Sequence, residues 1–283
     1  MTTPMRPIQF CALALAMVAC ASAARADDQP FLTLDATDIE PELGREIEQS
    51  FQWNSGLSDR AFQDLEGQTE FEYGWSDRMQ VGLATSYSWS YEHDHLTPPV
   101  SSLSTGQWGG IAGEAIYQAM NVYFDPIGLG FLVSAKAGPS ERTIEALVLM
   151  QKNFVNDRLR IVVNGGGSFG SKKNGIWSDA GALTFNAGVA YNITWDFSAA
   201  LEFNAEHDFD GLLINGRGAP TTTGYYFGPT LQYVALPWRA TLGLQTQLPW
   251  GSDAAHAPGS VEHGYLADAE RLRIELRVTR SFY

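Results

Sequence analysis

Residues 79–91 read MQVGLATSYSWSY, and this stretch decides the fold. Most alternate residues are large and apolar, whereas those between them are small or polar. A period of two predicts a β-strand with one apolar and one polar face. Strands of soluble sheets usually have about 5–6 residues, whereas this stretch is long enough to cross a bilayer when tilted. Tyr87, Trp89 and Tyr91 gather at one end, where a membrane interface favours rings with a polar atom. We therefore interpret the stretch as one strand of a transmembrane β-barrel.

The same alternation recurs along the chain. We expect an all-β fold, a transmembrane antiparallel up-and-down β-barrel of about 12 strands, and bacterial single-chain barrels have even strand numbers. Residues 143–152 are apolar on both faces in the middle, which leaves their register open. A soluble periplasmic β-sandwich is the rival fold, but outward aromatic residues on nearly every strand disfavour it. The expected strands cover residues 46–53, 68–75, 79–91, 109–119, 128–137, 143–152, 158–169, 180–192, 197–206, 225–233, 240–248 and 271–283.

Three parts precede or form this barrel. Residues 1–26 resemble a secretory signal peptide, because Arg6 precedes an apolar run and Ala24-Arg25-Ala26 supplies small residues for cleavage. A lipoprotein signal with Cys20 as the lipidated residue is the alternative. Residues 27–45 are expected to be a periplasmic N-terminal segment, and residues 46–283 to be the outer-membrane barrel.

Charge and cysteine content exclude several classes of function. Cleavage after residue 26 removes two of the 18 basic residues and none of the 32 acidic ones, so the net charge becomes −16. Such a chain is a poor partner for nucleic acid. Both cysteines, Cys11 and Cys20, fall within the expected signal, so the mature chain has neither a disulfide nor a thiolate metal site. We expect no cofactor and no metal.

The connections between the expected strands alternate in length. Those after the even-numbered strands are short, whereas residues 54–67, 92–107, 207–223 and 250–269 form long connections. Short periplasmic turns and long outer loops are typical of bacterial barrels. The pattern predicts the outer membrane of a Gram-negative cell, with both termini periplasmic and with lipid and lipopolysaccharide as partners. The final Phe282-Tyr283 resembles the C-terminal signal read by the barrel-assembly machinery, although the lipid-facing phase falls on Phe282.

Three short motifs resemble one known family. They are the hairpin YGWSDRMQ at residues 73–80, DPIG at 125–128 and FGP at 227–229. The family is the outer-membrane group labelled "MetA-pathway of phenol degradation", and the similarity would cover most of the mature chain. The resemblance implies a barrel that passes small organic molecules, aromatic ones among them. It implies no particular binding residue.

Charged residues at inward positions are the candidate solute path. Arg273 and Arg277 of the last strand would face glutamates of the first two strands across the closing seam. Such pairs would fix the strand register; the sharper hypothesis is a transverse field that orients a polar solute, with Glu202 and Glu206 on the opposite wall setting ion preference. The candidate residues are Glu48, Glu70, Glu72, Lys136, Arg160, Glu202, Glu206, Arg273, Glu275 and Arg277.

Twelve strands leave a narrow lumen, between the filled eight-stranded barrels and the open sixteen-stranded ones. A small pore and a plugged barrel are both compatible with that size, and residues 27–44 are the candidate plug. We therefore expect a porin-like channel for passive uptake or efflux of small solutes, aromatic or hydrophobic ones included, and not an enzyme.

A barrel enzyme of the lipase or protease type and a purely structural surface barrel are the alternatives. Glu206-His207-Asp208 with Asp210 is the most acid–base-like cluster, but it lacks a serine at a recognisable motif. His93 and His95 are two ligands without further spacing support for a metal. The run Gly165-Gly166-Gly167 suits a barrel bend. As a phosphate-binding loop it lacks the lysine and the following helix.

Overall fold

The computed structural model describes residues 30–56, 60–94, 101–174, 176–211, 222–253, 261–262, 265–266 and 270–282. The expected signal peptide, His95, His256 and His263 lie outside these ranges, and so does Tyr283. In the described ranges, no helix is long and apolar enough to cross a membrane.

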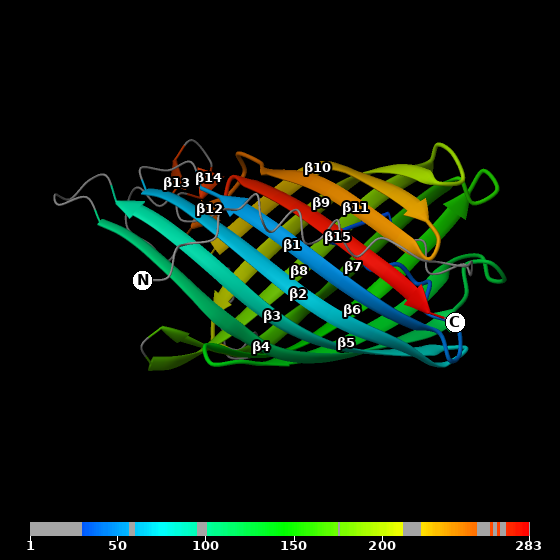
Figure 1. Ribbon diagram of the computed structural model, residues 1–283, viewed down its shortest axis with the longest axis horizontal. Helices are drawn as coiled ribbons and strands as arrows, with labels where there is room; N and C mark the ends of the chain where they lie inside the picture. Colours follow the sequence, from blue (N-terminus) through cyan, green and yellow to red (C-terminus); the bar gives the residue numbers. More distant parts are fainter. Residues whose placement is uncertain are drawn as a thin grey trace.

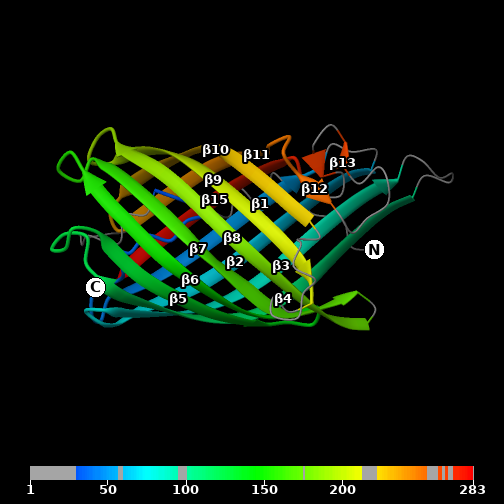
Figure 2. The same ribbon diagram turned by 180° about the vertical axis from the view of Figure 1, so that it is seen from behind.

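Twelve long strands form one closed antiparallel sheet, a β-barrel (Figure 1 and Figure 2). Strands β1 to β11 pair in chain order, and β15 pairs with both β11 and β1, which closes the wall. The pair Ser252–Asp253 (β12) extends β10, and Val261–Glu262 (β13) pairs with Tyr265–Leu266 (β14). The long strands are β1 Arg45–Ser55, β2 Arg60–Ser76, β3 Met79–Asp94, β4 Ser101–Met120, β5 Gly128–Ala137, β6 Glu141–Phe154, β7 Leu159–Asn174, β8 Ile176–Asn192, β9 Phe197–Asp210, β10 Thr222–Ala235, β11 Trp238–Gln247 and β15 Leu272–Phe282.

The expected fold is confirmed, but several expected loops are strand. Most of residues 54–67 belongs to β1 and β2, and β3 and β4 run far into the expected loop 92–107. Residues 170–178 are also almost wholly strand, in β7 and β8. Paired hairpins that project beyond the apolar band carry polar side chains on both faces, so the alternation that marks a lipid-crossing strand stops before the strand does. The connections after the first and third strands are therefore shorter than expected.

The two faces of the wall differ as the alternation predicts. Outward side chains are large, apolar and exposed, for example Leu83 at 61%, Trp89 at 58% and Phe185 at 47%. Inward positions are mostly polar and buried. Arg280 is one charged exception on the outward face, and its guanidinium carbon lies 5.1 Å from the ring centre of Trp238 and 4.7 Å from that of Phe282. Cation–π contacts at a ring-rich rim let a charge remain on this face.

The two ends of the barrel are distinct. We call one the turn end; it holds the start of β1, the end of β15 and the connections at residues 77–78, 121–127, 155–158, 193–196 and 236–237. We call the other the loop end. The glycine run lies between them, and β7 continues through it in unbroken register with β6. A Cβ on Gly166 would lie 2.0 Å from the carbonyl oxygen of Ala146, so glycine is needed there for close strand approach rather than for a loop.

Residues 30–40 lie inside the barrel, and residues 41–43 are exposed where the chain reaches the turn end; we call residues 30–44 the luminal segment. From Leu32, beside Glu202 of β9, the segment passes Gln151 of β6 and Gln80 of β3 before it enters β1. Leu43 then donates a backbone hydrogen bond to Gly74 at the end of β2. The segment thus follows the inner wall toward the turn end.

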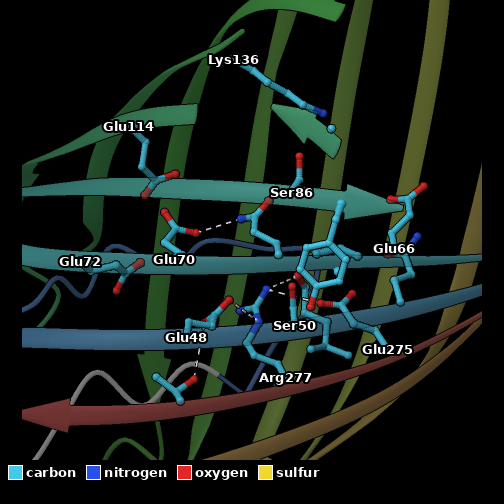
Figure 3. Close-up of a pocket in the computed structure, with 18 of the residues that line it drawn as sticks. Glu48, Ser50, Glu66, Glu70, Glu72, Ser86, Glu114, Lys136, Glu275 and Arg277 are labelled. Atoms are coloured by element: carbon cyan, nitrogen blue, oxygen red, sulfur yellow. Dashed lines mark hydrogen bonds and ion pairs between the residues drawn. The ribbon is translucent and has the colours of Figure 1, made fainter. Parts of the chain in front are cut away.

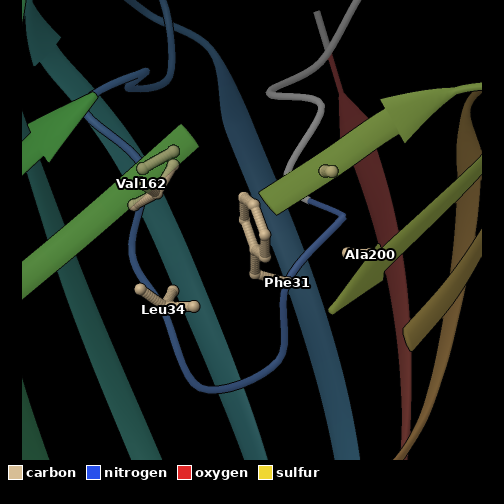
Figure 4. Close-up of a cluster of buried hydrophobic side chains, with 6 residues drawn as sticks. Phe31, Leu34, Val162 and Ala200 are labelled. Atoms are coloured by element: carbon tan, nitrogen blue, oxygen red, sulfur yellow. The ribbon is translucent and has the colours of Figure 1, made fainter. Parts of the chain in front are cut away.

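Two small apolar clusters hold the luminal segment. Phe31, Leu34 and Ala36 are each 1% exposed or less and pack with Val162, Ala190 and Ala200 of the wall (Figure 4). Ile39 packs against a second cluster of inward residues from β4, β5 and β6, namely Ile116, Leu132, Leu147 and Leu149. This explains why residues 143–152 are apolar on both faces. The outward face of this strand is on the apolar outer surface of the barrel, and the inward face packs against the luminal segment.

Candidate functional site

A cavity of about 500 Å³ lies in the lumen between the luminal segment and the wall formed mainly by β11, β15 and β1 to β4, with Lys136 of β5 and Glu141 of β6 also in its lining. A second cavity of about 340 Å³ shares Gln68, Glu70, Glu114 and Lys136 with it. We call the two together the luminal cavity. Its wall reaches from Glu46 near the turn end to Tyr87 and Glu141 toward the loop end, so it extends along much of the barrel.

Carboxylates dominate the charged lining of the first cavity. Among the described residues, three basic side chains line it, and each forms an ion pair: Lys136 with Glu141 at 2.9 Å, Arg277 with Glu48 at 3.1 Å, and Arg239 with Glu46. The lining thus has a large acidic excess. The nine acidic residues are Asp35, Glu46, Glu48, Glu66, Glu70, Glu72, Glu114, Glu141 and Glu275.

Three of these carboxylates converge. Glu70, Glu72 and Glu114 each place one oxygen within 4.8 Å of the others (Figure 3). Gly82 of β3 lies opposite Glu72 on one side and Glu114 on the other. A Cβ at Gly82 would lie 2.7 Å from Glu114 Cγ and from Glu70 Oε1, so the absence of a side chain makes room for both carboxylates. We call these three residues the acidic triplet.

A buried polar group lines the cavity near the turn end. Glu46 is 2% exposed and contacts Arg239 of β11, and it accepts a hydrogen bond of 2.8 Å from Ser281 of β15. These three side chains come from three adjacent strands on either side of the barrel closure. The ion pair therefore both joins the closing strands and bounds the cavity.

The structure divides the sequence-predicted site residues into three groups. Glu48, Glu70, Glu72, Lys136, Glu275 and Arg277 all line the cavity. Glu202 instead holds the luminal segment, and Arg160 is buried on β7. Glu206 pairs with Arg273 at 3.1 Å, and the Arg273 guanidinium also stacks 3.6 Å over the ring of Tyr226.

Arg277 pairs with Glu48 across the seam, as the sequence argument predicts. Arg273 does not follow that argument: its partners are Glu206 and Glu270 rather than glutamates of β1 and β2. The reason is position along the strand. Arg273 lies opposite Asn54, near the loop end, whereas the inward glutamates of β1 lie nearer the turn end.

Glu202 accepts three hydrogen bonds from the luminal segment. Its carboxylate accepts hydrogen bonds of 2.9 Å from the backbone N–H groups of Leu32 and Thr33, and one of 2.6 Å from the Thr33 hydroxyl. A fourth, 2.5 Å long, comes from Thr230 of β10. Arg277 completes the clamp by donating to the carbonyl oxygen of Leu32 at 2.8 Å. The Glu202 carboxylate thus binds the N–H group, and the Arg277 guanidinium the carbonyl oxygen, of the peptide that joins Leu32 to Thr33.

The candidate acid–base cluster does not assemble. Alternation along β9 directs Glu206 inward, where it meets Arg273, and His207 outward, where its ring lies 5.9 Å from that of Tyr225. His207 Nδ1 lies 3.1 Å from the hydroxyl of Thr223. The side chains of His93 and Asp210 are outside the described part, as is His95. The described members of this cluster therefore face opposite sides of the wall.

Six charged residues that line the first cavity are not among the predicted solute-path residues, and one of them, Glu141, precedes the expected sixth strand. Glu46 and Glu114 were expected to point inward, but their convergence on the cavity depends on strand register. Asp35 and Glu66 fell in an expected extended segment and an expected connection. Arg239 precedes the expected eleventh strand. The sequence contains a pattern that places Glu66 on the inner face. It is the first of four polar residues at alternate positions, followed by Gln68, Glu70 and Glu72.

Known families and structures give the fold a context. The profile described as "Family of unknown function (DUF6662)" matches residues 23–282. No curated protein sequence matches the chain. The COG4313 outer membrane channel from Pseudomonas putida F1 superposes with a TM-score of 0.62 and 13% identity, over 88% of this chain and 100% of that one.

Two porins are similar at a lower level. The KdgM porin gives a TM-score of 0.53 with 12% identity over 84% of this chain and 99% of its own. The NanC porin gives 0.53 with 10% identity over 83% and 98%. These likenesses show an outer-membrane type of barrel. The label suggested by the hairpin motifs, the MetA pathway, is not the name of the matching family.

Proposed function

We propose that this chain, which belongs to the DUF6662 family, is an outer-membrane channel through which small solutes pass passively. The observation that carries the proposal is the luminal cavity, a polar space along the inside of a barrel whose outer face is apolar. The similar barrels named as channels and porins support it. Because the lining is largely polar and charged, small hydrophilic solutes fit it better than aromatic or hydrophobic ones.

The luminal segment is the constriction in this proposal. It occupies one side of the lumen and leaves the cavity on the other, between Leu32, Thr33 and Asp35 and the wall formed mainly by β11, β15 and β1 to β4. It donates hydrogen bonds to Glu202 of β9, Gln151 of β6 and Gln80 of β3, so it is held at widely separated positions around the wall. We infer that the segment limits the size of the solute.

The orientation follows the general asymmetry of bacterial barrels. We place the turn end, where β1 begins and β15 ends, in the periplasm, and the loop end at the cell surface beside lipopolysaccharide. The final strand then carries its aromatic Phe282 where the barrel-assembly machinery would read it. An enzyme is not proposed, since Glu206 and His207 lie on opposite faces of β9.

Conductance tests this proposal. The mature chain, refolded into a planar lipid bilayer, should give discrete current steps, and a variant lacking residues 27–44 should give larger ones. Heat-modifiable migration on a gel shows whether each variant is a folded barrel. A folded barrel that stays silent in both forms would overturn the channel. Current steps of equal size from both forms would show that the luminal segment is not the constriction.

A further inference from the structure

We propose that the channel selects cations over anions, and that the carboxylates of the luminal cavity cause the selection. The inference rests on the proposed channel function and names the class of solute. Small inorganic cations and protonated amines fit this class.

The positive charges of the cavity lining are neutralised by ion pairs with carboxylates of the same lining. Lys136, Arg239 and Arg277 are each held by a glutamate of the same lining. Three further glutamates, those of the acidic triplet, have no ion pair to a basic group within the described part of the chain. The field in the water of the cavity is therefore that of an acidic surface.

The acidic triplet concentrates negative charge at one position in the cavity. The strand register aligns Glu72, Gly82 and Glu114 across β2, β3 and β4, all on the inner face. The three carboxylates line the cavity and lie close together (Figure 3). They have room to do so because Gly82, which lies between Glu72 and Glu114 in the sheet, has no side chain. Carboxylates this close repel one another, and a mobile cation between them lowers that repulsion. A low-dielectric wall strengthens the attraction between the carboxylates and the cation. Rings of glutamate or aspartate give cation preference in other channels by the same physics.

On the other side of the lumen, Arg160 of β7 is 5% exposed and does not line the luminal cavity. There the luminal segment packs Phe31 and Leu34 against Val162 and Ala200. The inward residues of the neighbouring strands include three asparagines in register, Asn164, Asn186 and Asn204, which carry no charge. A solute in the luminal cavity therefore passes between a filled side and an acidic wall.

The test is the reversal potential of the full mature chain in a bilayer with a tenfold KCl gradient. We expect the potassium-to-chloride permeability ratio to be well above one. The variant E70Q/E72Q/E114Q keeps side-chain size and should bring the ratio close to one. The matched control, D77N/D157N, removes two carboxylates in turns outside the cavity and should leave the ratio unchanged.

A second readout needs no substitution. Spermine added to the unmodified channel should block the potassium current at concentrations where a neutral polyol of similar length has no effect. Current without cation preference, or a ratio that the triplet variant leaves unchanged, would overturn the inference while the channel function stands. A folded barrel without current in any variant would overturn the channel function itself.

Discussion

Arg277 and Glu48 form an ion pair across the β15–β1 junction, with 3.1 Å between Nε and Oε1, and the same guanidinium donates to the carbonyl oxygen of Leu32 at 2.8 Å. One side chain thus joins the barrel closure to the luminal segment. The substitution Arg277→Met should lower the free energy of unfolding by about 3 kcal/mol, because it leaves buried partners without a counter-charge. It should also raise conductance.

Denaturant titration in lipid vesicles measures the first effect, and single-channel recording the second. Arg158→Met is the matched control, since Arg158 is exposed in a turn. A stable Arg277→Met barrel with unchanged conductance would show that the segment does not depend on this anchor.

Glu202 should hold the luminal segment more firmly than any other carboxylate described here, through its contacts with Leu32 and Thr33. A single reporter cysteine at Ala36, which is fully buried, can measure this. In the background of Ala36→Cys, Glu202→Ala should speed maleimide labelling at least tenfold, since loss of charged hydrogen bonds of about 1.5–3 kcal/mol each shifts the segment toward its free state. The exposed Glu42 of the same segment provides the control, Glu42→Ala, which should leave the rate as it was.

Gly188 of β8 makes room for the segment. A Cβ there would lie 2.7 Å from Leu34 Cδ1 and from Phe31 Cε1. Gly188→Val should therefore displace Phe31 and cost about 1–3 kcal/mol by overpacking. Gly113→Val is the control, because a Cβ on Gly113 would meet nothing closer than the Gly82 carbonyl at 3.9 Å. Equal midpoints of unfolding for the two variants would contradict the packing at Gly188.

The two faces of β3 should respond oppositely to charge. Leu83 faces outward with 61% of its surface exposed, whereas Ser86 lines the cavity. Leu83→Arg should cost about 2–4 kcal/mol near the bilayer midplane, and Ser86→Arg should be tolerated. Unfolding titrations of both variants in vesicles check this. Equal costs would contradict the assignment of the faces.

The lipid-crossing part of each strand could be predicted from sequence because lipid demands an apolar side chain at every second position. Residues 128–137 were predicted to the residue, since both ends of β5 coincide with the end of the apolar band. Beyond the band water accepts polar side chains on either face. The alternation then ends while the hydrogen-bonded pairing continues, as it does from Gly170 to Asn174.

The candidate site was predictable only in part. Which side chains point inward follows from a period of two, so Glu70 and Glu72 could be placed in the lumen. Which inward residues meet depends on the stagger between strands, and that is how Arg273 came to lie beside Glu206 rather than Glu70. The docking of the luminal segment left a trace in the sequence, the second apolar face of residues 143–152, whose partner only the fold reveals.

The luminal segment also sets an order of assembly. It is synthesised first, yet Leu32 is held by residues 170 and 245 positions later in the chain. Its binding surface does not exist until β9 and β15 have joined the sheet. Insertion of the segment must therefore accompany or follow the last strand pairing, and protection of the Ala36→Cys reporter from maleimide would mark the moment at which the barrel is complete.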